Sequence, residues 1–321
     1  MSIRTYLEDR WFDLRQRRGP VSSSTLGKIA VGIAVIVALY YPIGMFVVHK
    51  IDDDTTMKVT VNPGQSHTVA TAVALLDREV NVNRWTPMDP FFLPGAALDN
   101  MPNFQTGIVY AISRFAIEMS DQIGRVRGSS QVDEDLDQAA GLLKYKPDVW
   151  VYDMSESWLP QRSSAEQYRH GLEALARYNQ RLGEGNAVFE TRADNLIATL
   201  ERISADLGSA SAVIDNSIND LGMFSWDADD VFYRNKGRLY AYFMLLEAMK
   251  ADFGQVIQEK QLTNVWDQML KSLRQAAEMD PLVVVNGAPD GVVFPSHLAA
   301  QGFYLLRART QLREISNVLL K

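Results

Sequence analysis

Two proline-rich stretches of the sequence carry residue types that could bind or cleave a polysaccharide. Residues 84–103 and 147–160 combine aromatic rings with carboxylates and amides. Aromatic faces stack on sugar rings, and two carboxyl groups about 5–10 Å apart can hydrolyse a glycosidic bond. If the two stretches meet, they form a groove that could do this chemistry. The candidate groove residues are Trp85, Asp89, Phe91, Phe92, Asp99, Asn100, Asn103, Trp150, Asp153, Glu156 and Trp158.

The same residues have an alternative, structural interpretation. Trp and Phe in a proline-rich loop often close the end of a helical bundle, and Asp and Asn in such loops often cap turns. The glycan-binding interpretation predicts that Trp85 and Trp158 lie together on one exposed groove. Burial of both side chains in the end of a bundle would exclude that role.

The rest of the sequence offers no recognisable catalytic or cofactor motif. It has no cysteine, no His-Glu-x-x-His, no G-x-S-x-G and no glycine-rich phosphate loop. We therefore expect no metal site and no cofactor, and we identify no catalytic residue. The run Asp52–Asp54 is expected to be solvated, and Asp227 or Asp229 to cap a helix. Four histidines are expected to be structural or exposed, namely His49, His67, His170 and His297.

Helical periodicity indicates the elements that position these residues. Apolar residues recur every three or four positions through most of the chain beyond residue 66, and Ser163-x-x-Glu166 is a capping box. Alternating steps of three and four predict near-antiparallel packing of the helices. Two β-rich runs, 282–285 and 292–294, flank a turn-forming stretch and predict one hairpin. The predicted fold is mainly α, an antiparallel helical bundle with one short β-hairpin.

An apolar segment, Ile29–Val48, precedes the bundle and carries no charge over its 20 residues. A helix of that length spans about 30 Å, the thickness of the hydrocarbon layer. The segment is longer than the apolar part of a signal peptide, and no small-x-small cleavage site follows it, which favours an uncleaved signal anchor. Five Lys or Arg residues lie in the 20 positions before it and two in the 20 after it. This asymmetry predicts a cytoplasmic N-terminus and a periplasmic C-terminal domain at the bacterial inner membrane.

The charges divide at the same place. Residues 1–50 carry seven basic and three acidic side chains, and residues 51–321 carry 25 basic and 36 acidic ones. An acidic domain repels phosphate backbones, so no nucleic-acid partner is expected. The predicted parts are a cytoplasmic tail (1–28), a transmembrane helix (29–48), a juxtamembrane linker (49–65) and a periplasmic helical domain (66–321). The tail forms either a basic amphipathic helix on the inner leaflet or a solvated basic segment.

Several long sequence blocks resemble one bacterial family. They include WTPMDPFFLPGAALDNMPNFQTG, DVWVYDMSESW, YNQRLGEGNAVFETRADNL, DDVFYRNKGRLYAY and the run from VVVNGAPDG to FPSHLAAQGFYLLRARTQL. The chain resembles, from the apolar segment to its C-terminus, the inner-membrane family known as domain of unknown function 2333. The resemblance implies a proteobacterial envelope protein. It brings no established activity, cofactor or catalytic residue.

These observations lead to a preferred function and two alternatives. The preferred one is a non-enzymatic, membrane-anchored scaffold or adaptor of a cell-envelope assembly. Its expected partners are the lipid bilayer and other envelope proteins or a second copy of the chain. The first alternative is a peptidoglycan- or glycan-binding protein, which could also be hydrolytic and would use the two aromatic stretches. The second is a sensor, which would need a separate output partner because the cytoplasmic tail is short.

Overall fold

The computed structural model describes residues 23–126, 132–152, 158–220, 222, 225–289, 291 and 294–321. It divides into two compact units, Met1–Val47 and Val48–Lys321, and each is described by itself. The described residues contain ten α-helices and no β-strand longer than an isolated bridge. The prediction of a mainly α fold is confirmed.

The first unit is an apolar helix, α2 (Ser23–Val48), with Pro42 inside it. Among the described residues it is the one helix long and apolar enough to cross a membrane. A single apolar helix near the N-terminus is consistent with a signal anchor or a signal sequence. The predicted amphipathic tail falls mainly on residues 1–22, outside the described part of the chain.

The second unit, here called the helical domain, contains nine α-helices in its described residues. A π-helix, η1 (Arg78–Val82), continues the first of them, and a 3-10 helix, η2 (Pro94–Ala97), lies in the first proline-rich stretch. The periodicity does not predict α5 and α9, which are too short to show a repeating stripe. The α-helices are α3 (His67–Asp77), α4 (Asn100–Val126), α5 (Glu134–Leu142), α6 (Ser164–Gly183), α7 (Ala193–Asp220), α8 (Trp226–Asp252), α9 (Gly254–Glu259), α10 (Thr263–Ala277) and α11 (His297–Leu319).

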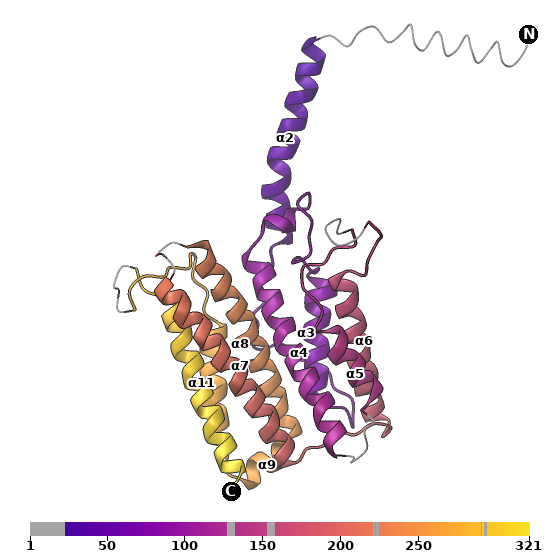
Figure 1. The fold of residues 1–321 in the computed structure, drawn as a ribbon, viewed down its shortest axis with the longest axis vertical. Coiled ribbons are helices and arrows are strands. Elements are labelled where there is room, and N and C mark those ends of the chain that lie inside the picture. The colour runs from indigo at the N-terminus through magenta and orange to yellow at the C-terminus, as the bar shows by residue number, and fades with distance from the viewer. Residues whose placement is uncertain are drawn as a thin grey trace, which may run out of the picture. The chain divides into compact units, whose positions relative to one another are not determined.

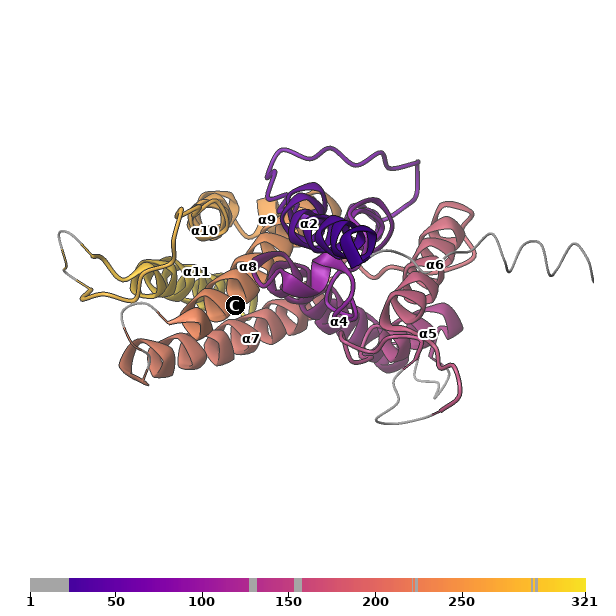
Figure 2. The same ribbon diagram turned by 90° about the horizontal axis from the view of Figure 1, so that it is seen from above.

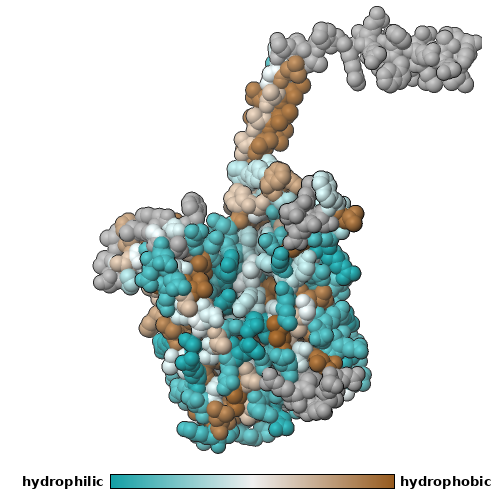
Figure 3. Space-filling model, in the orientation of Figure 1, coloured by the Kyte–Doolittle hydropathy of each residue, from teal (hydrophilic) through white to brown (hydrophobic). Residues whose placement is uncertain are grey.

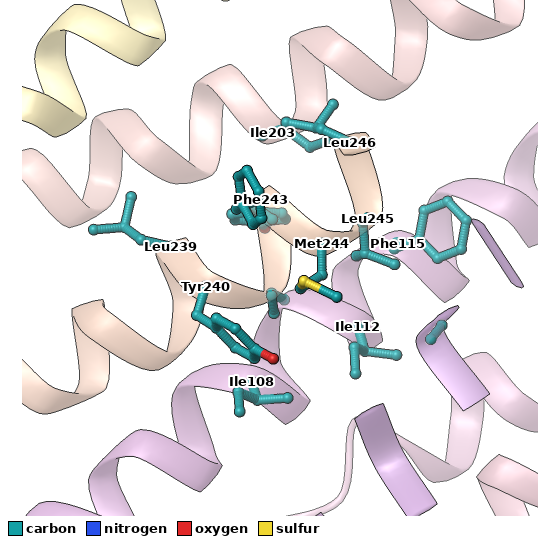
Figure 4. Packing of buried hydrophobic residues seen from close by; sticks show 14 of the residues in the cluster. Ile108, Ile112, Phe115, Ile203, Leu239, Tyr240, Phe243, Met244, Leu245 and Leu246 are labelled. Atoms are coloured by element: carbon teal, nitrogen blue, oxygen red, sulfur yellow. The ribbon is translucent and has the colours of Figure 1, made fainter. Parts of the chain in front are cut away.

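The helices of this domain form two lobes, visible from the side in Figure 1 and from above in Figure 2. Helices α3 to α6 pack together in one lobe, and α7, α8, α10 and α11 pack together in the other. The lobes meet along α4 and α8, and buried residues of both helices form one continuous core across this seam (Figure 4). Both lobes therefore belong to a single hydrophobic core rather than to two independent domains.

The seam differs from the predicted antiparallel packing. Asn103 accepts a hydrogen bond from Arg234, and the Arg238 guanidinium lies 4.3 Å from the centre of the Tyr110 ring. Residue numbers therefore rise together along α4 and α8, so the two helices are parallel. Other pairs do run antiparallel, as in α7 and α11, where Arg309 donates to the carbonyl oxygen of Ser204.

Two glycines allow this close parallel approach. A Cβ atom at Gly107 would clash with the carbonyl oxygen of Arg234, and one at Gly237 would clash with that of Phe104. Glycine inside a helix normally costs about 1 kcal/mol relative to alanine. Here the absence of a side chain lets two backbones touch, and this contact joins the lobes.

The predicted hairpin is wrong. The described residues between α10 and α11 form only isolated bridges, Asn286 with Ser296 and Ala288 with Pro295. The Asn286 side chain donates to the carbonyl oxygen of Ser217 at the end of α7. Among the described residues, hydrogen bonds to a neighbouring helix thus take the place of strand pairing.

Helix starts follow the predicted capping in part. Ser163 accepts a hydrogen bond from the backbone of Glu166, which confirms Ser163 as the N-cap of α6 and thus one half of the predicted capping box, and α11 has Ser296 as its N-cap. The prediction for α8 is wrong: its N-cap position is Ser225, and Asp227 and Asp229 lie inside the first turn. There their charge favours the helix dipole without a capping hydrogen bond.

One end of the helical domain gathers its first residues and most of its loops. Lys50 donates a backbone hydrogen bond to Met101 at the start of α4, and Thr55 bonds to Glu278 just beyond α10. We call this the loop end, and the opposite end, where α4, α6, α8 and α11 finish, the far end. The loop end also carries both proline-rich stretches, which precede α4 and α6 (Figure 1).

Candidate functional site

The two proline-rich stretches meet at a buried tryptophan. Trp85 is 1% exposed, and its indole N–H donates to the carbonyl oxygen of Pro147 over 2.8 Å. Its ring packs edge-on against Tyr168 of α6, with 4.9 Å between the ring centres. Trp85 therefore closes the end of the first lobe, and the prediction that it shares an exposed groove with Trp158 is wrong.

A buried glutamine fixes the base of the first stretch. The Gln105 side-chain oxygen accepts hydrogen bonds from the backbone and the hydroxyl of Thr86. Its amide nitrogen donates to the carbonyl oxygen of Arg84 over 3.0 Å. Because these groups are buried and satisfied, the loop leaves the core at a defined place.

The Asp89 carboxylate pairs with a residue of its own loop. Arg84 forms an ion pair with it over 2.5 Å, and the Asp89 side chain is almost fully buried. Burial raises the pKa of the Asp89 carboxyl above its ordinary value, and the Arg84 charge opposes that shift. Gly95 permits the approach, because a Cβ atom there would clash with the Asp89 carboxylate. Asp89 therefore stabilises the loop and faces no open groove.

The tips of the two stretches expose a row of aromatic rings. Phe91 packs edge-on against Phe92, Phe92 against Trp150, and Trp150 against Tyr152, with ring centres 5.5 to 5.6 Å apart. Phe91 is 83% exposed, and Phe92 and Tyr152 are also exposed. The condition on which the groove depended, that the two stretches meet, is thus met by Phe92 and Trp150, which lie at the surface of the domain.

The second stretch adds two more exposed residues. Trp158 is 87% exposed, and Leu159 beside it is also exposed. The backbone hydrogen bond from Gln161 to Val151 holds the two arms of this loop together. The aromatic patch is hereafter the set Phe91, Phe92, Trp150, Tyr152, Trp158 and Leu159.

Three predicted residues belong to a separate polar cluster at the start of α8. Asn103 donates to Asp230 over 2.7 Å, and Asn100, with its amide turned to donate, lies 2.7 Å from Asp229. Burial, followed by repulsion from Asp99 and Asp230, raises the pKa of Asp229 to about 6. These groups tie α4 to α8 and are engaged with one another.

A pocket of about 460 Å³ opens beside this cluster. Its wall is partly polar and partly apolar, and it includes part of the connection between α10 and α11. Leu282 is fully exposed there, and Val283 and Phe294 are exposed in the same connection. The pocket is lined by Asn100, Ser225, Asp229, Tyr233, Leu282, Val283 and Val284.

The remaining candidates that the structure describes are not grouped into a catalytic arrangement. Asp153 and Glu156 lie outside the described residues. His297 accepts a hydrogen bond from the backbone of Val285, and His170 lies near Glu166 and Glu173. No group of three or more potential metal ligands occurs in the described part of the chain.

The acidic run Asp52–Asp54, expected to be solvated, is solvated only in part: Asp54 is exposed, whereas Asp52 and Asp53 are half-buried and pair with cations of the domain. Lys236 is completely buried in α8, and its ammonium group lies 2.7 Å from the Asp53 carboxylate. The same group donates to the carbonyl oxygen of Met279 over 2.8 Å. A buried ammonium needs such partners, since an unpaired charge in the core costs several kcal/mol.

A second buried cation holds the neighbouring aspartates. Arg78 forms ion pairs with Asp52 and with the fully buried Glu79, and it donates to the Tyr240 hydroxyl. Tyr240 in turn donates to the carbonyl oxygen of Asp54 over 2.9 Å. Burial raises the pKa of Tyr240 to about 12, so this hydroxyl keeps its proton at neutral pH. We call these contacts the aspartate clasp.

Sequence reasoning missed the clasp for a physical reason. Charged residues are rarely buried unless they are paired, so a charge run is ordinarily assigned to the surface. One signal was present: Lys236 lies between Phe232 and Leu239 on the apolar face of α8, where an unpaired charge is unfavourable. The buried Lys236 ammonium therefore needed an acidic partner from another part of the sequence.

Comparison with known proteins identifies the family. Residues 29–225 and 222–321 match the family described as "Uncharacterized protein conserved in bacteria (DUF2333)". The chain belongs to the DUF2333 family. Neither the comparison with curated proteins nor that with solved structures gave a match.

Membership of DUF2333 confirms the resemblance seen in the sequence and leaves the activity to be argued from the structure. The two matched stretches meet at residues 222–225, just before α8. Together they include the apolar helix, the aspartate clasp and both lobes.

Proposed function

We propose that this DUF2333 protein is a single-pass protein of the bacterial inner membrane. In this proposal α2 is a signal anchor, the N-terminus is cytoplasmic and the helical domain is periplasmic. The domain acts as a scaffold or adaptor in an assembly of the cell envelope. The basic residues before α2 and the acidic domain after it support this orientation.

The aspartate clasp is the observation that carries the proposal. A free linker after a membrane anchor would let the attached domain move widely. Here the residues that follow α2 pair with buried cations of the domain, namely Arg78 and Lys236. The first residues of the helical domain are therefore bound to it and do not form a long free spacer. A short connection to an anchor suits a protein that organises partners better than one that must search for a diffusing substrate.

The test is purification of the full chain from membranes in mild detergent. A stoichiometric envelope protein or a homo-oligomer of defined size should accompany it, and light scattering with mass spectrometry would measure both. Asp53→Ala, which opens the clasp, should weaken that association, whereas Asp280→Ala, which removes an exposed carboxylate, should not. A clean monomer without a partner would contradict the scaffold function.

Topology is tested separately. A reporter enzyme that is active only in the periplasm, fused to the C-terminus, should be active. A reporter that is active only in the cytoplasm should be inactive at the same position. The reverse result would exclude the periplasmic location.

Peptidoglycan or glycan binding is the second candidate, and the exposed ring row from Phe91 to Tyr152 favours it. The buried Trp85 and the paired Asp89 take no part in it, so the candidate reduces to binding by the aromatic patch. Isolated peptidoglycan should retain the full-length protein in detergent, and the double variant Phe91→Ser, Trp158→Ser should lose retention. Equal retention of both proteins would exclude this role for the patch.

A further inference from the structure

The loop end carries two exposed apolar surfaces on different lobes. The first is the aromatic patch at the tips of the two proline-rich stretches. The second consists of Leu282 and Val283 between α10 and α11, and we call it the aliphatic patch. Figure 3 shows a domain face that is mostly hydrophilic, with apolar residues scattered over it and present at the loop end. Large exposed apolar groups at one end of a domain indicate a contact with something outside it.

Chain connectivity shows what lies nearest to this end. Only His49 separates Lys50 from the last residue of α2, and a step of two residues spans at most about 7 Å. Lys50 donates to Met101, and Thr55 and Asp53 contact the domain next to the aliphatic connection, at Glu278 and Lys236. The domain is thus held by its loop end, at the point where the chain leaves the apolar helix.

We propose that both patches enter the interfacial layer of the lipid bilayer that α2 spans. The helical domain would then rest on the membrane at three places: the anchor, the aromatic patch and the aliphatic patch. This inference rests on the proposed function in one respect, because it requires α2 to be inserted.

The composition of the patches fits this occupant better than a glycan or a nucleic acid. Trp and Tyr are enriched where a membrane protein crosses the headgroup layer, because each has an apolar ring and a polar edge. Leu159, Leu282 and Val283 have no ring to stack on a sugar, but they gain free energy by leaving water for hydrocarbon. The aromatic and aliphatic patches differ in shape, but both gain free energy when they move from water into the membrane interface.

Charge indicates how the contact is made. Asp99, Asp227 and Asp280 are exposed at the loop end. Carboxylates do not attract anionic lipid, so the contact is apolar rather than electrostatic. Binding should therefore persist at high salt and weaken as the anionic lipid fraction rises, which is the opposite of a polybasic contact.

The test uses the natural absence of cysteine in this chain. Single cysteines replace Phe91, Trp158 or Leu282 in the full-length protein, and each carries the environment-sensitive fluorophore NBD. Val188→Cys and Leu320→Cys, at exposed positions of the far end, are the matched controls. The proteins are reconstituted into phosphatidylethanolamine–phosphatidylglycerol vesicles with and without doxyl-labelled lipid. Circular dichroism confirms that each variant is folded.

We expect lipid-borne doxyl groups to quench the three loop-end probes at least twice as strongly as the two controls. Equal quenching at the loop end and the far end would overturn the inference. A blue-shifted emission without lipid quenching would also overturn it and would indicate a protein partner or a second copy. A probe response to soluble peptidoglycan fragments, again without lipid quenching, would overturn it in favour of the glycan candidate.

Flotation of the same vesicles separates this inference from the proposed function. If the protein floats with the vesicles after alkaline washing but the loop-end probes are not quenched, the anchor stands and only the lipid contact of the patches fails. If the protein does not float, both proposals fail.

Discussion

The aspartate clasp and the aromatic patch lie at the same end of the helical domain, but their side chains differ in solvent exposure. The clasp takes charged groups, including the fully buried Lys236 and Glu79, into the interior and pairs them. The patch leaves aromatic rings such as Phe91 and Trp158 in solvent. The pairing in the clasp is not complete, because the Nη2 atom of Arg78 is buried without a hydrogen-bond partner among the residues that the structure describes. The contrast indicates that the clasp serves stability and the patch serves contact.

The largest expected effect separates two tryptophans of the proline-rich stretches. Trp85→Ala should lower the free energy of unfolding by about 4 kcal/mol, because it leaves a cavity beside Tyr168 and an unpaired carbonyl at Pro147. Trp158→Ala should change it by less than about 0.5 kcal/mol, because that ring is in solvent. Guanidinium unfolding of the full chain in detergent, followed by circular dichroism, measures both. Similar losses for the two variants would remove the distinction between interior and patch.

The clasp is tested by removing one partner of its buried pair. Asp53→Ala should cost about 3 kcal/mol, because the Lys236 ammonium stays buried without its nearest counter-charge. The same unfolding measurement on Asp280→Ala is the control, and we expect less than about 0.5 kcal/mol for this exposed carboxylate. The double variant Asp53→Ala, Lys236→Met should recover part of the loss, because the buried ammonium that lost its counter-charge is then absent. A loss below about 1 kcal/mol for Asp53→Ala would show that the clasp contributes little stability.

For the seam between the lobes, we predict that alanine substitutions at two glycines change the free energy of unfolding in opposite directions. Gly237→Ala should lower the free energy of unfolding by about 2 to 3 kcal/mol, because its Cβ atom would clash with the backbone of α4. Gly141→Ala in α5 has open space around the new methyl group and should raise stability by about 0.5 to 1 kcal/mol. Thermal unfolding of both variants measures the difference. If both stabilise, the backbones are not in contact.

The smallest expected effect concerns Asp229 and pH. Its pKa of about 6 in the folded protein lies above the ordinary value of 3.8, so the folded state binds more protons between these pH values. The contribution of this group to stability therefore falls as pH rises from about 4 to about 6. Asp229→Asn should be more stable than the natural protein at pH 7.5, by at most about 1 kcal/mol because the group is half exposed. The difference should vanish near pH 4.

Unfolding at several pH values measures this difference, with Asp194→Asn as the control. Asp194 is an exposed carboxylate in the first turn of α7 and should have little effect at either pH. A stability difference for Asp229→Asn that is independent of pH would contradict the assigned cause.

Much of the fold is predictable because it depends on local patterns. The apolar stripe beginning at Phe104 predicts α4, Ser163 predicts the start of α6, and the uncharged segment from Ile29 predicts most of α2. The parallel seam is not predictable in this way, because it depends on the meeting of Gly107 and Gly237, far apart in sequence. The hairpin fails because a β-rich composition is a weak preference that hydrogen bonds to α7 override.

The candidate site is predictable only as a region. The sequence marks the two proline-rich stretches as unusual but leaves open whether they meet, and the contact between Phe92 and Trp150 answers that question. Residue type cannot say that Trp85 is buried and Phe91 exposed, because both fit either role. Whether each ring is buried depends on how far its residue lies from the end of η1. Trp85 lies three residues after η1, and its ring reaches Tyr168, whereas Phe91 lies at the tip of the loop.

The hydrogen bond between Tyr240 and Asp54 joins residues 186 positions apart, so it constrains the order of events during synthesis. Asp52 to Asp54 are synthesised long before α8. Until α8 is synthesised, the faces of α3 and α4 that pack on it remain exposed to solvent. A nascent chain interrupted before α8 would keep Arg78 and Glu79 without Tyr240 and would expose half of the seam. Such a fragment would expose apolar surface of the kind that chaperones bind, and completion of α8 would cover it.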